Sequence, residues 1–141
     1  MTPAQDTLIK TSFTQVAPIA DQAATIFYAR LFELDPSIRP MFAHTDMPGQ
    51  RRNLMQTLTV VVKSIDRLET IVPAVHALGR RHAGYGVEPG HFATVGQALL
   101  DTLAIGLGED FTPDVKDAWA TAYGILADVM IGAMATEEAA A

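Results

Sequence analysis

Residues 75–86 of the chain read VHALGRRHAGYG. Val75, Leu78, Gly79 and His82 follow one another at spacings of three and four residues, so they share one face of a helix. That face is apolar except for the imidazole of His82. The pattern therefore predicts an amphipathic helix that carries a histidine on its buried side, in its last turn.

A histidine in the last turn of a helix can bond to the backbone one turn earlier. We expect His82 to donate its Nδ1–H to the carbonyl of Leu78, which would fix the ring and leave Nε2 free to bind a metal. Gly84 and Gly86 let the chain turn away and leave room beside the ring for a bulky planar group. Taken alone, the segment is also explained by a core histidine that is hydrogen-bonded and binds no ligand.

The other three histidines are expected at the surface. His44 lies in a polar segment, His76 beside the apolar face and His91 near the start of a helix. No pair of histidines or acidic residues has the spacing of a zinc or di-iron site on a helix. A metal cage made only of side chains is therefore not expected.

Helical periodicity continues on both sides of this segment, and prolines and glycines separate one helical stretch from the next. No strand pattern of useful length is present. The sequence predicts an all-α fold. Helices are expected over about 3–17, 19–34, 50–65, 72–83, 89–106 and 113–134, with a short helical turn at 36–42 and a loop at 44–49.

Composition narrows the class of protein further. The chain has 141 residues, of which 49% are hydrophobic and 18% charged, so we expect residues 1–141 to form a single domain with a full apolar core. The net charge of −6 argues against nucleic acid or an anionic membrane as partner. Cysteine is absent, which excludes disulfides and thiolate metal ligands. Without the pattern of a signal peptide or a membrane span, a soluble cytoplasmic protein is expected.

Blocks of sequence along most of the chain match a known family in order and spacing. They are IFYARLF at 26–32, Asp35-Pro36 with Met41-Phe42, Gln50-Arg51 with Leu54-Met55, Arg81-His82-Ala83 followed by GVEPGHF at 86–92, Val95-Gly96 with Leu99-Leu100, and DAW at 117–119 with AYG at 122–124. On these motifs, residues 7–131 resemble the single-domain bacterial haemoglobins and the globin domain of flavohaemoglobins.

The resemblance implies a globin fold, a three-over-three helical sandwich that holds haem b between the third and fourth long helices. His82 matches the proximal histidine, the protein ligand of the iron. Phe42 matches the phenylalanine that packs on the porphyrin. Further haem contacts are implied for Leu78, Val87 and Phe92.

Tyr28, Gln50 and Leu54 match the distal residues of flavohaemoglobins. O2 bound to haem iron carries partial negative charge, so hydrogen bonds from the Tyr28 hydroxyl and the Gln50 amide would each stabilise it by roughly 1–3 kcal/mol. Leu54 would exclude water. Without the resemblance, Tyr28 is also explained as a core tyrosine bonded to a carbonyl, and Gln50 as a solvent-exposed helix residue.

The chain departs from the flavohaemoglobin pattern on the proximal side. That family has a tyrosine where this chain has Phe92, and a glutamate where it has Met134, with Glu137 and Glu138 a turn further on. The polar network that would polarise the His82 imidazole is therefore in question. The chain also ends where a reductase domain would begin, so we expect a separate reductase to supply electrons.

The resemblance implies a protein that binds O2, NO and other diatomic gases reversibly. We predict an enzyme that converts nitric oxide to nitrate with bound O2, a nitric oxide dioxygenase in which Tyr28 and Gln50 are the catalytic residues. The alternative is a non-enzymatic protein for O2 storage or delivery, or a gas sensor. One distal pocket could serve each of these functions.

Overall fold

The computed structural model describes the backbone of residues 1–140 and the side chains of residues 1–134. This part of the chain forms helices and short connections and contains no strand, so the all-α prediction is confirmed. The α-helices are α1 (Pro3–Val16), α2 (Ala20–Leu34), α3 (Met47–Lys63), α4 (Val72–Gly84), α5 (His91–Leu107) and α6 (Pro113–Ala140). The 3-10 helices are Ala17–Ile19, Pro36–Phe42, Ile65–Thr70 and Gly108–Asp110.

The first helix begins at Pro3, as predicted, and Thr2 caps it. The Thr2 hydroxyl accepts a hydrogen bond from the backbone N–H of Gln5 at 3.2 Å, and the Gln5 side chain accepts one from the backbone N–H of Thr2 at 3.0 Å. This reciprocal capping box satisfies two backbone donors that the helix itself cannot pair. Pro3 at the first helical position costs nothing, because its missing N–H would have had no partner there.

Three predicted boundaries are wrong. The loop expected at 44–49 ends early, because α3 already begins at Met47, with Pro48 in its first turn, where proline is tolerated. Ile65 does not belong to that helix, because α3 ends at Lys63 and Ile65 opens a 3-10 helix. The last helix continues past Met134 to Ala140; the side chains of Glu137 and Glu138 lie outside the described residues.

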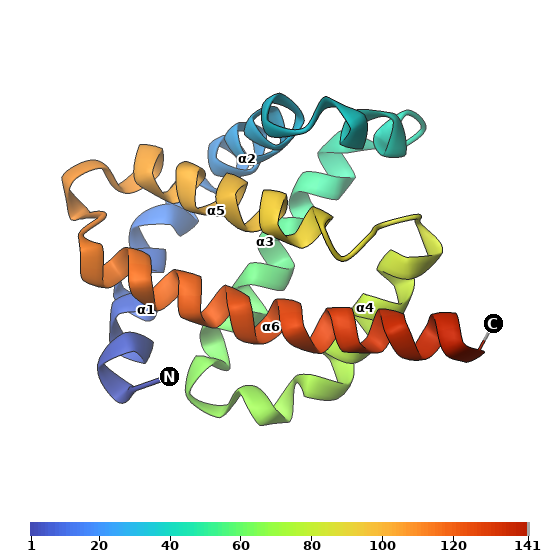
Figure 1. Ribbon diagram of the computed structural model, residues 1–141. Coiled ribbons are helices and arrows are strands. Elements are labelled where there is room, and N and C mark those ends of the chain that lie inside the picture. Colours follow the sequence, from blue (N-terminus) through green and yellow to red (C-terminus); the bar gives the residue numbers. More distant parts are fainter. Residues whose placement is uncertain (141) are drawn as a thin grey trace.

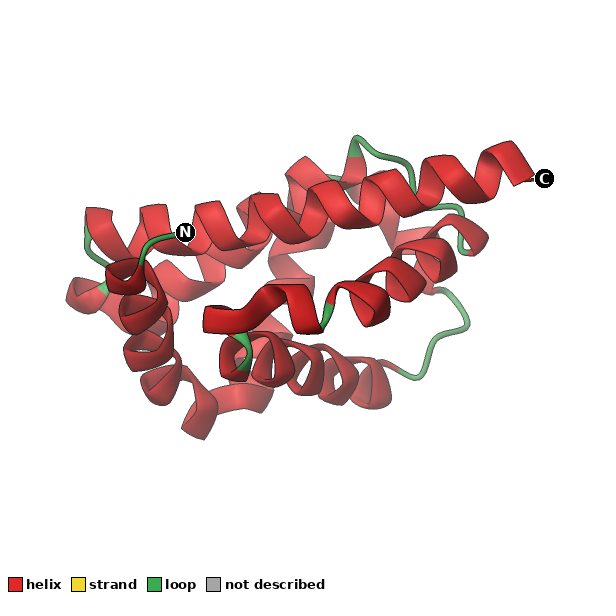
Figure 2. Ribbon diagram, turned by 90° about the horizontal axis from the view of Figure 1, so that it is seen from below, coloured by secondary structure: helices red, strands yellow, loops and turns green. Residues whose placement is uncertain are grey.

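The two C-terminal helices cross the front of the molecule, and α3 passes behind them (Figure 1). The long helix α6 has α4 alongside its C-terminal half in both views (Figures 1 and 2). Gly79 of α4 lies where the two helices meet, since a Cβ built on it would be 2.6 Å from the carbonyl oxygen of Met130 in α6. Glycine therefore permits this close crossing, which sets the position of the helix that carries His82.

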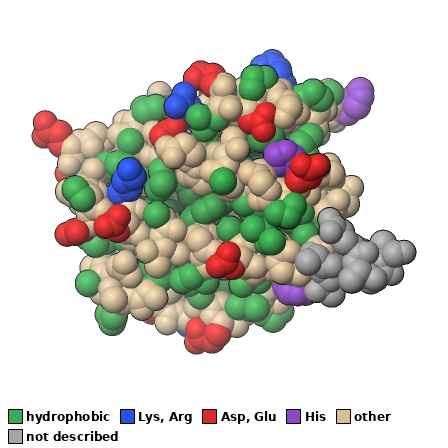
Figure 3. All heavy atoms as spheres, viewed as in Figure 1, with side chains coloured by type: hydrophobic (Ala, Val, Ile, Leu, Met, Phe, Trp, Pro, Cys, Tyr) green, Lys and Arg blue, Asp and Glu red, His purple; other side chains and the backbone are tan. Residues whose placement is uncertain are grey.

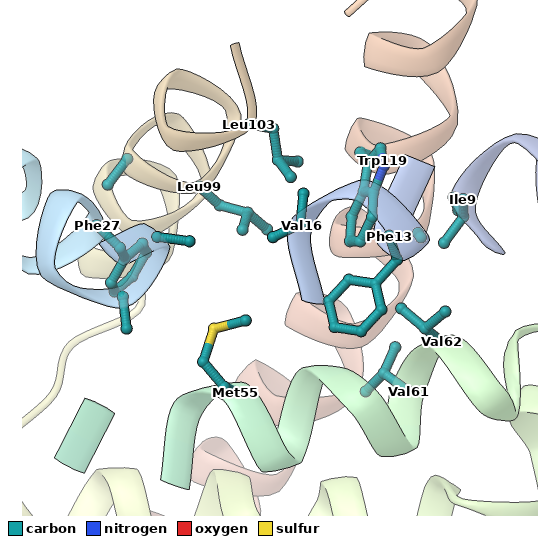
Figure 4. Packing of buried hydrophobic residues seen from close by; sticks show 14 of the residues in the cluster. Ile9, Phe13, Val16, Phe27, Met55, Val61, Val62, Leu99, Leu103 and Trp119 are labelled. Atoms are coloured by element: carbon teal, nitrogen blue, oxygen red, sulfur yellow. The ribbon is translucent and has the colours of Figure 1, made fainter. Parts of the chain in front are cut away.

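The main core lies between α1, α2, α3, α5 and α6, where Val16, Met55 and Leu99 extend toward one another (Figure 4). Trp119 is 3% exposed there, and its indole N–H donates to the Ser12 hydroxyl at 2.9 Å. A small cavity of about 20 Å³ remains inside this packing. Its lining is Phe13, Val16, Ala23, Phe27, Leu54, Met55, Leu58, Leu99, Thr102, Leu103 and Trp119.

The surface carries scattered acidic side chains among apolar and polar ones on the face drawn in Figure 3, in keeping with the net charge of −6. An ion pair joins α2 to α5, in which Nε of Arg30 lies 2.7 Å from a carboxylate oxygen of Asp101. Within the described residues, no helix combines the length and the apolar character that a membrane crossing requires.

Candidate functional site

Tyr28 and Gln50 lie in hydrogen-bond contact. Tyr28 projects from α2 into the core and is 6% exposed, whereas Gln50 lies in the first turns of α3 and is half-buried. The Gln50 amide donates to the Tyr28 hydroxyl oxygen at 3.1 Å. Because the amide supplies the proton of this bond, the hydroxyl proton of Tyr28 is left to donate to another acceptor.

Besides its chain neighbour Phe27, two phenylalanines lie against the Tyr28 ring. The ring centroid of Phe42 lies 5.6 Å from that of Tyr28, and the centroid of Phe32 lies 6.2 Å from it. Phe32 and Phe42 also contact each other edge-on at 5.5 Å. No role at the site was predicted for Phe32; its spacing of four residues from Tyr28 in one helix is the signal that places them side by side.

Burial raises the pKa of the Tyr28 phenol above its usual value of 10.0, and the hydrogen bond from Gln50 lowers it by less. Burial also raises the pKa of Tyr123, in α6. Both hydroxyls therefore stay protonated at neutral pH. For Tyr28, this means that a hydrogen-bond donor is held in a mostly apolar environment.

The raised pKa values predict alkaline destabilisation. Above pH 10 the unfolded chain ionises its tyrosines, while the folded chain keeps Tyr28 and Tyr123 protonated. The contribution of these two tyrosines to stability is therefore fully present below pH 10, and it is lost as the pH rises toward their raised pKa values. The free energy of unfolding should fall by up to about 1.4 kcal/mol per pH unit for each such tyrosine. Urea unfolding between pH 8 and 11 measures this slope, and Tyr28→Phe should reduce it. An unchanged slope in Tyr28→Phe would contradict the assignment to Tyr28.

His82 makes the hydrogen bond that the sequence predicts. Its Nδ1 lies 2.7 Å from the carbonyl oxygen of Leu78, four residues earlier in α4, and the side chain is half-buried. The bond fixes the ring, and with Nδ1 as the donor, Nε2 is the basic nitrogen. This is the tautomer that a metal ligand requires.

The other histidines differ from His82. His76 accepts a hydrogen bond from Arg80 at 3.0 Å, and His91 accepts one from the backbone N–H of Glu88 at 3.0 Å. His44 is exposed. His76 and His91 each use a ring nitrogen for a local surface bond, so His82 remains the best candidate ligand.

An apolar cluster lies beside the His82 ring. The Phe92 ring centroid is 6.4 Å from that of His82, and Phe92 is 7% exposed. Met134, 1% exposed, packs in the same cluster, and half-buried Val87 packs against it. The two positions that are polar in flavohaemoglobins are thus filled by apolar side chains. The Leu78 carbonyl is the hydrogen-bond acceptor that the described residues offer to the His82 ring.

The predicted site residues fall into two groups, which belong to two separate hydrophobic clusters. Tyr28, Phe42 and Leu54 belong to the larger cluster, and Gln50 is attached to it through Tyr28. Phe92 and Val87 belong to the smaller cluster, next to His82 and Leu78. Tyr123 packs against both clusters, and its hydroxyl donates to the carbonyl of Phe92 at 2.6 Å.

The donor set fits a haem iron better than a bare metal ion. Within the described residues, no group of three or more His, Cys, Asp or Glu side chains is close enough to hold a metal. One oriented imidazole in apolar surroundings is what a haem iron requires from the protein, because the porphyrin supplies the remaining ligands in its plane. The residues present therefore fit haem, with His82 as the residue that would hold it.

Comparisons with known proteins agree with this geometry. Flavohemoproteins of Rhodopirellula baltica and Bacillus subtilis are 32% and 36% identical to the chain, over 89% and 75% of its length. The chain spans only 31% and 27% of the length of these curated relatives. A solved bacterial globin from Campylobacter jejuni superposes with a TM-score of 0.84 at 25% identity, covering 96% of this chain and 97% of that one.

The agreement in structure over nearly the whole chain confirms the predicted three-over-three globin fold. The sequence model of the Globin family matches residues 25–130, which is more than half of the chain. That span contains Tyr28, Gln50 and His82. The chain is a haem globin and belongs to the globin family.

Proposed function

We propose that this globin converts nitric oxide to nitrate with bound O2, and that haem b is its cofactor. Haem held by His82 would supply the iron at which the gas binds and is activated. The observation that carries the proposal is the hydrogen bond from Gln50 to Tyr28, because it leaves the Tyr28 proton available to a bound gas. The relatives that share most of this chain are flavohemoproteins, which supports the proposal.

Each residue of the distal group has a distinct part in this proposal. Tyr28 would offer its hydroxyl as a hydrogen-bond donor to the gas, in surroundings where a charge-assisted hydrogen bond is strong. Gln50 orients the Tyr28 hydroxyl and stands beside it as a second donor. Leu54 would exclude water, and Phe42 would pack against the porphyrin.

On the proximal side, the His82 ring is held by an uncharged hydrogen-bond partner. The His82 Nδ1–H donates to an uncharged carbonyl, that of Leu78, and its apolar neighbours Phe92 and Met134 offer no charge to draw the proton away. This arrangement favours reversible gas binding over peroxidase chemistry. It supports O2 storage or delivery as the second candidate function.

Rapid mixing distinguishes the two functions. The oxygenated protein is mixed with nitric oxide while its visible spectrum is followed, and the products are analysed. Dioxygenase chemistry gives stoichiometric nitrate and oxidised haem, and sustained turnover then depends on electrons from a separate reductase. Slow reaction, or turnover that fails with every reductase tested, favours the carrier.

Tyr28→Phe is expected to raise the O2 dissociation rate by about 10- to 100-fold, because it removes a hydrogen bond to a charged acceptor worth roughly 1.5–3 kcal/mol. Gln50→Leu should raise the rate by less, because Tyr28 keeps its proton. Stopped-flow displacement of O2 measures both rates. Gln97→Leu is the matched control, since Gln97 is exposed and donates to Asp101 on α5. If Tyr28→Phe behaves like Gln97→Leu, Tyr28 is not the donor.

A further inference from the structure

The positive charge of this acidic chain is concentrated in two segments. Residues 36–63 contain four Lys or Arg residues and one acidic residue, and residues 72–84 contain two arginines and no acidic residue. The rest of the chain contains four Lys or Arg residues and fifteen acidic ones. The two positive segments are also those that flank the candidate haem site, since the first holds Gln50 and the second holds His82.

Three arginines of these segments carry charge that no carboxylate neutralises. Arg39, Arg52 and Arg81 are exposed, and none of them forms an ion pair with an acidic group of the described side chains. By contrast, Arg30 on α2 pairs with Asp101 at 2.7 Å. The three unpaired arginines therefore keep a positive charge that can attract a negatively charged partner.

Arg39 shows how such a charge is held in place. Its guanidinium carbon lies 5.5 Å from the centroid of the Phe32 ring, in a cation–π contact. The Phe32 ring in turn contacts Phe42, the residue that would pack on the porphyrin, with ring centroids 5.5 Å apart. An aromatic ring orients the guanidinium without cancelling its charge, as a carboxylate would. The charge of Arg39 thus lies one aromatic ring away from the residue expected on the haem.

Tyr85 offers an aromatic contact beside the second segment. It follows α4 directly, is 67% exposed, and its ring centroid lies 6.2 Å from that of His82. A Cβ at the flanking Gly84 or Gly86 would meet no atom within 4 Å, so the backbone on either side is open. Exposed tyrosine close to arginine is a composition enriched at protein–protein interfaces. This favours a protein as the partner over the phosphates of a membrane or a nucleic acid.

We propose that these two segments form the docking surface for the electron donor of this globin, and that the donor is a protein with an acidic surface around its redox group. Such a donor is attracted to Arg39, Arg52 and Arg81 and repelled by the acidic remainder of the chain, so it approaches with its redox group toward the haem. The inference rests on the proposed function, which requires a separate reductase, and it names the docking surface and the charge of that partner.

The proposed step transfers one electron. The donor is oxidised by one electron, ferric haem is reduced to ferrous haem, and no bond of the globin forms or breaks. The arginines take no part in the electron transfer itself, because they act on the approach and orientation of the donor. Their effect should therefore depend on ionic strength, since salt screens the attraction between exposed charges.

The experiment follows reduction of the ferric, haem-loaded protein by reduced flavodoxin, a small flavoprotein with a strongly acidic surface. Stopped-flow absorbance without oxygen measures the second-order rate at low and at high ionic strength. The wild-type rate should fall by about tenfold or more as salt is added. Arg39→Glu and Arg52→Glu, made one at a time, should each lower the low-salt rate several-fold, and together they should remove most of the salt dependence.

Lys116→Glu is the matched control for each single substitution. It also reverses an exposed positive charge, but Lys116 lies in the first turn of α6, whereas α4 lies alongside the C-terminal half of that helix (Figure 1). This variant should keep the wild-type rate. Photoreduced riboflavin is the control donor, because it has the same flavin chemistry but no net charge and no protein surface. It should reduce every variant at the wild-type rate.

Four outcomes would overturn the proposal. They are a wild-type rate that does not fall with salt, a wild-type protein that riboflavin reduces and flavodoxin does not, arginine variants that behave like Lys116→Glu, and arginine variants that react more slowly with riboflavin as well. The last result would assign the arginines to the haem itself. Binding of the wild-type protein to phosphatidylglycerol vesicles that both arginine variants lose, with normal reduction by flavodoxin, would assign the surface to a membrane instead.

Failure of the proposed function gives a different result. A protein that binds no haem shows no haem spectrum before the donor is added. A protein that binds haem but does not convert nitric oxide to nitrate leaves the reduction rates unaffected, because the measurement contains no nitric oxide.

Discussion

His82→Ala is expected to purify without the visible absorption of bound haem. The wild-type imidazole is fixed by its bond to Leu78, it is the histidine of α4 whose Nδ1 is the donor, so that Nε2 is its basic nitrogen, and Phe92 lies beside its ring. Without it, the described residues offer the iron no comparable ligand, so haem would be retained only through apolar contact. Absorption spectra of equal protein concentrations, before and after addition of hemin, measure the effect.

The control variants are His76→Ala and His91→Ala. Each removes an imidazole that makes one local bond, to Arg80 or to the backbone of Glu88, and each should keep the haem spectrum. His82→Gly adds a rescue test, because free imidazole should enter the space left by the side chain and restore the spectrum. Normal haem content in His82→Ala, with its helical circular dichroism intact, would disprove the assignment of the ligand.

Gly79→Val is expected to lower the free energy of unfolding by about 3 kcal/mol, the upper part of the range for overpacking. The added Cβ would lie 2.6 Å from the carbonyl oxygen of Met130 and 2.7 Å from its Cα, and neither backbone atom can rotate away. The helices α4 and α6 must therefore separate. Since His82 follows Gly79 by less than one turn, haem affinity should fall as well.

Gly84→Val is the matched control for this substitution. It makes the same chemical change in the same helix, but a Cβ at Gly84 meets no atom within 4 Å. Its cost should stay within the small helix-propensity difference of a surface position. Chemical denaturation and hemin titration of both variants test the prediction. Equal loss of stability in the two variants would show that the crossing of α4 and α6 does not depend on the small size of Gly79.

The helices could be predicted because their signals are local. Apolar residues recur at helical spacing, and the Thr2–Gln5 cap and the prolines at helix starts mark boundaries through contacts within one turn. The start of α3 could not be found in this way. Pro48 and Gly49 are typical of a loop. Both also fit into the first turn of a helix, because the backbone N–H groups there have no carbonyl partner within the helix.

The hydrogen bond on the His82 side of the site could be predicted from the sequence, whereas the one on the Tyr28 side could not. The bond from His82 to Leu78 spans one turn of a single helix, so spacing alone predicts it. The bond from Gln50 to Tyr28 joins α3 to α2, and it depends on how the two helices pack. The sequence suggested the Tyr28 hydroxyl and the Gln50 amide as two donors to a bound gas, and the structure adds the hydrogen bond that links them.

The contact of Tyr85 with His82 was also missed. The two residues are three apart, but Tyr85 lies at the very end of the helix between two glycines, where periodicity no longer fixes the direction of a side chain. The exposure of an aromatic ring at such a corner depends on the turn that follows. That turn depends in part on the positive φ of Gly86.

The small apolar cavity in the main core gives the protein a characteristic mechanical response. Its polar lining groups are already paired, since the Thr102 hydroxyl donates to the carbonyl of Ala98 and the Trp119 indole to Ser12, so water gains no hydrogen bond by entering. Unfolding removes this hollow and exposes its apolar lining to solvent, so it changes the total volume of protein and water. Hydrostatic pressure favours the state with the smaller total volume. Pressure should therefore favour the unfolded chain, in part through the loss of the space beside Leu54 and Phe27.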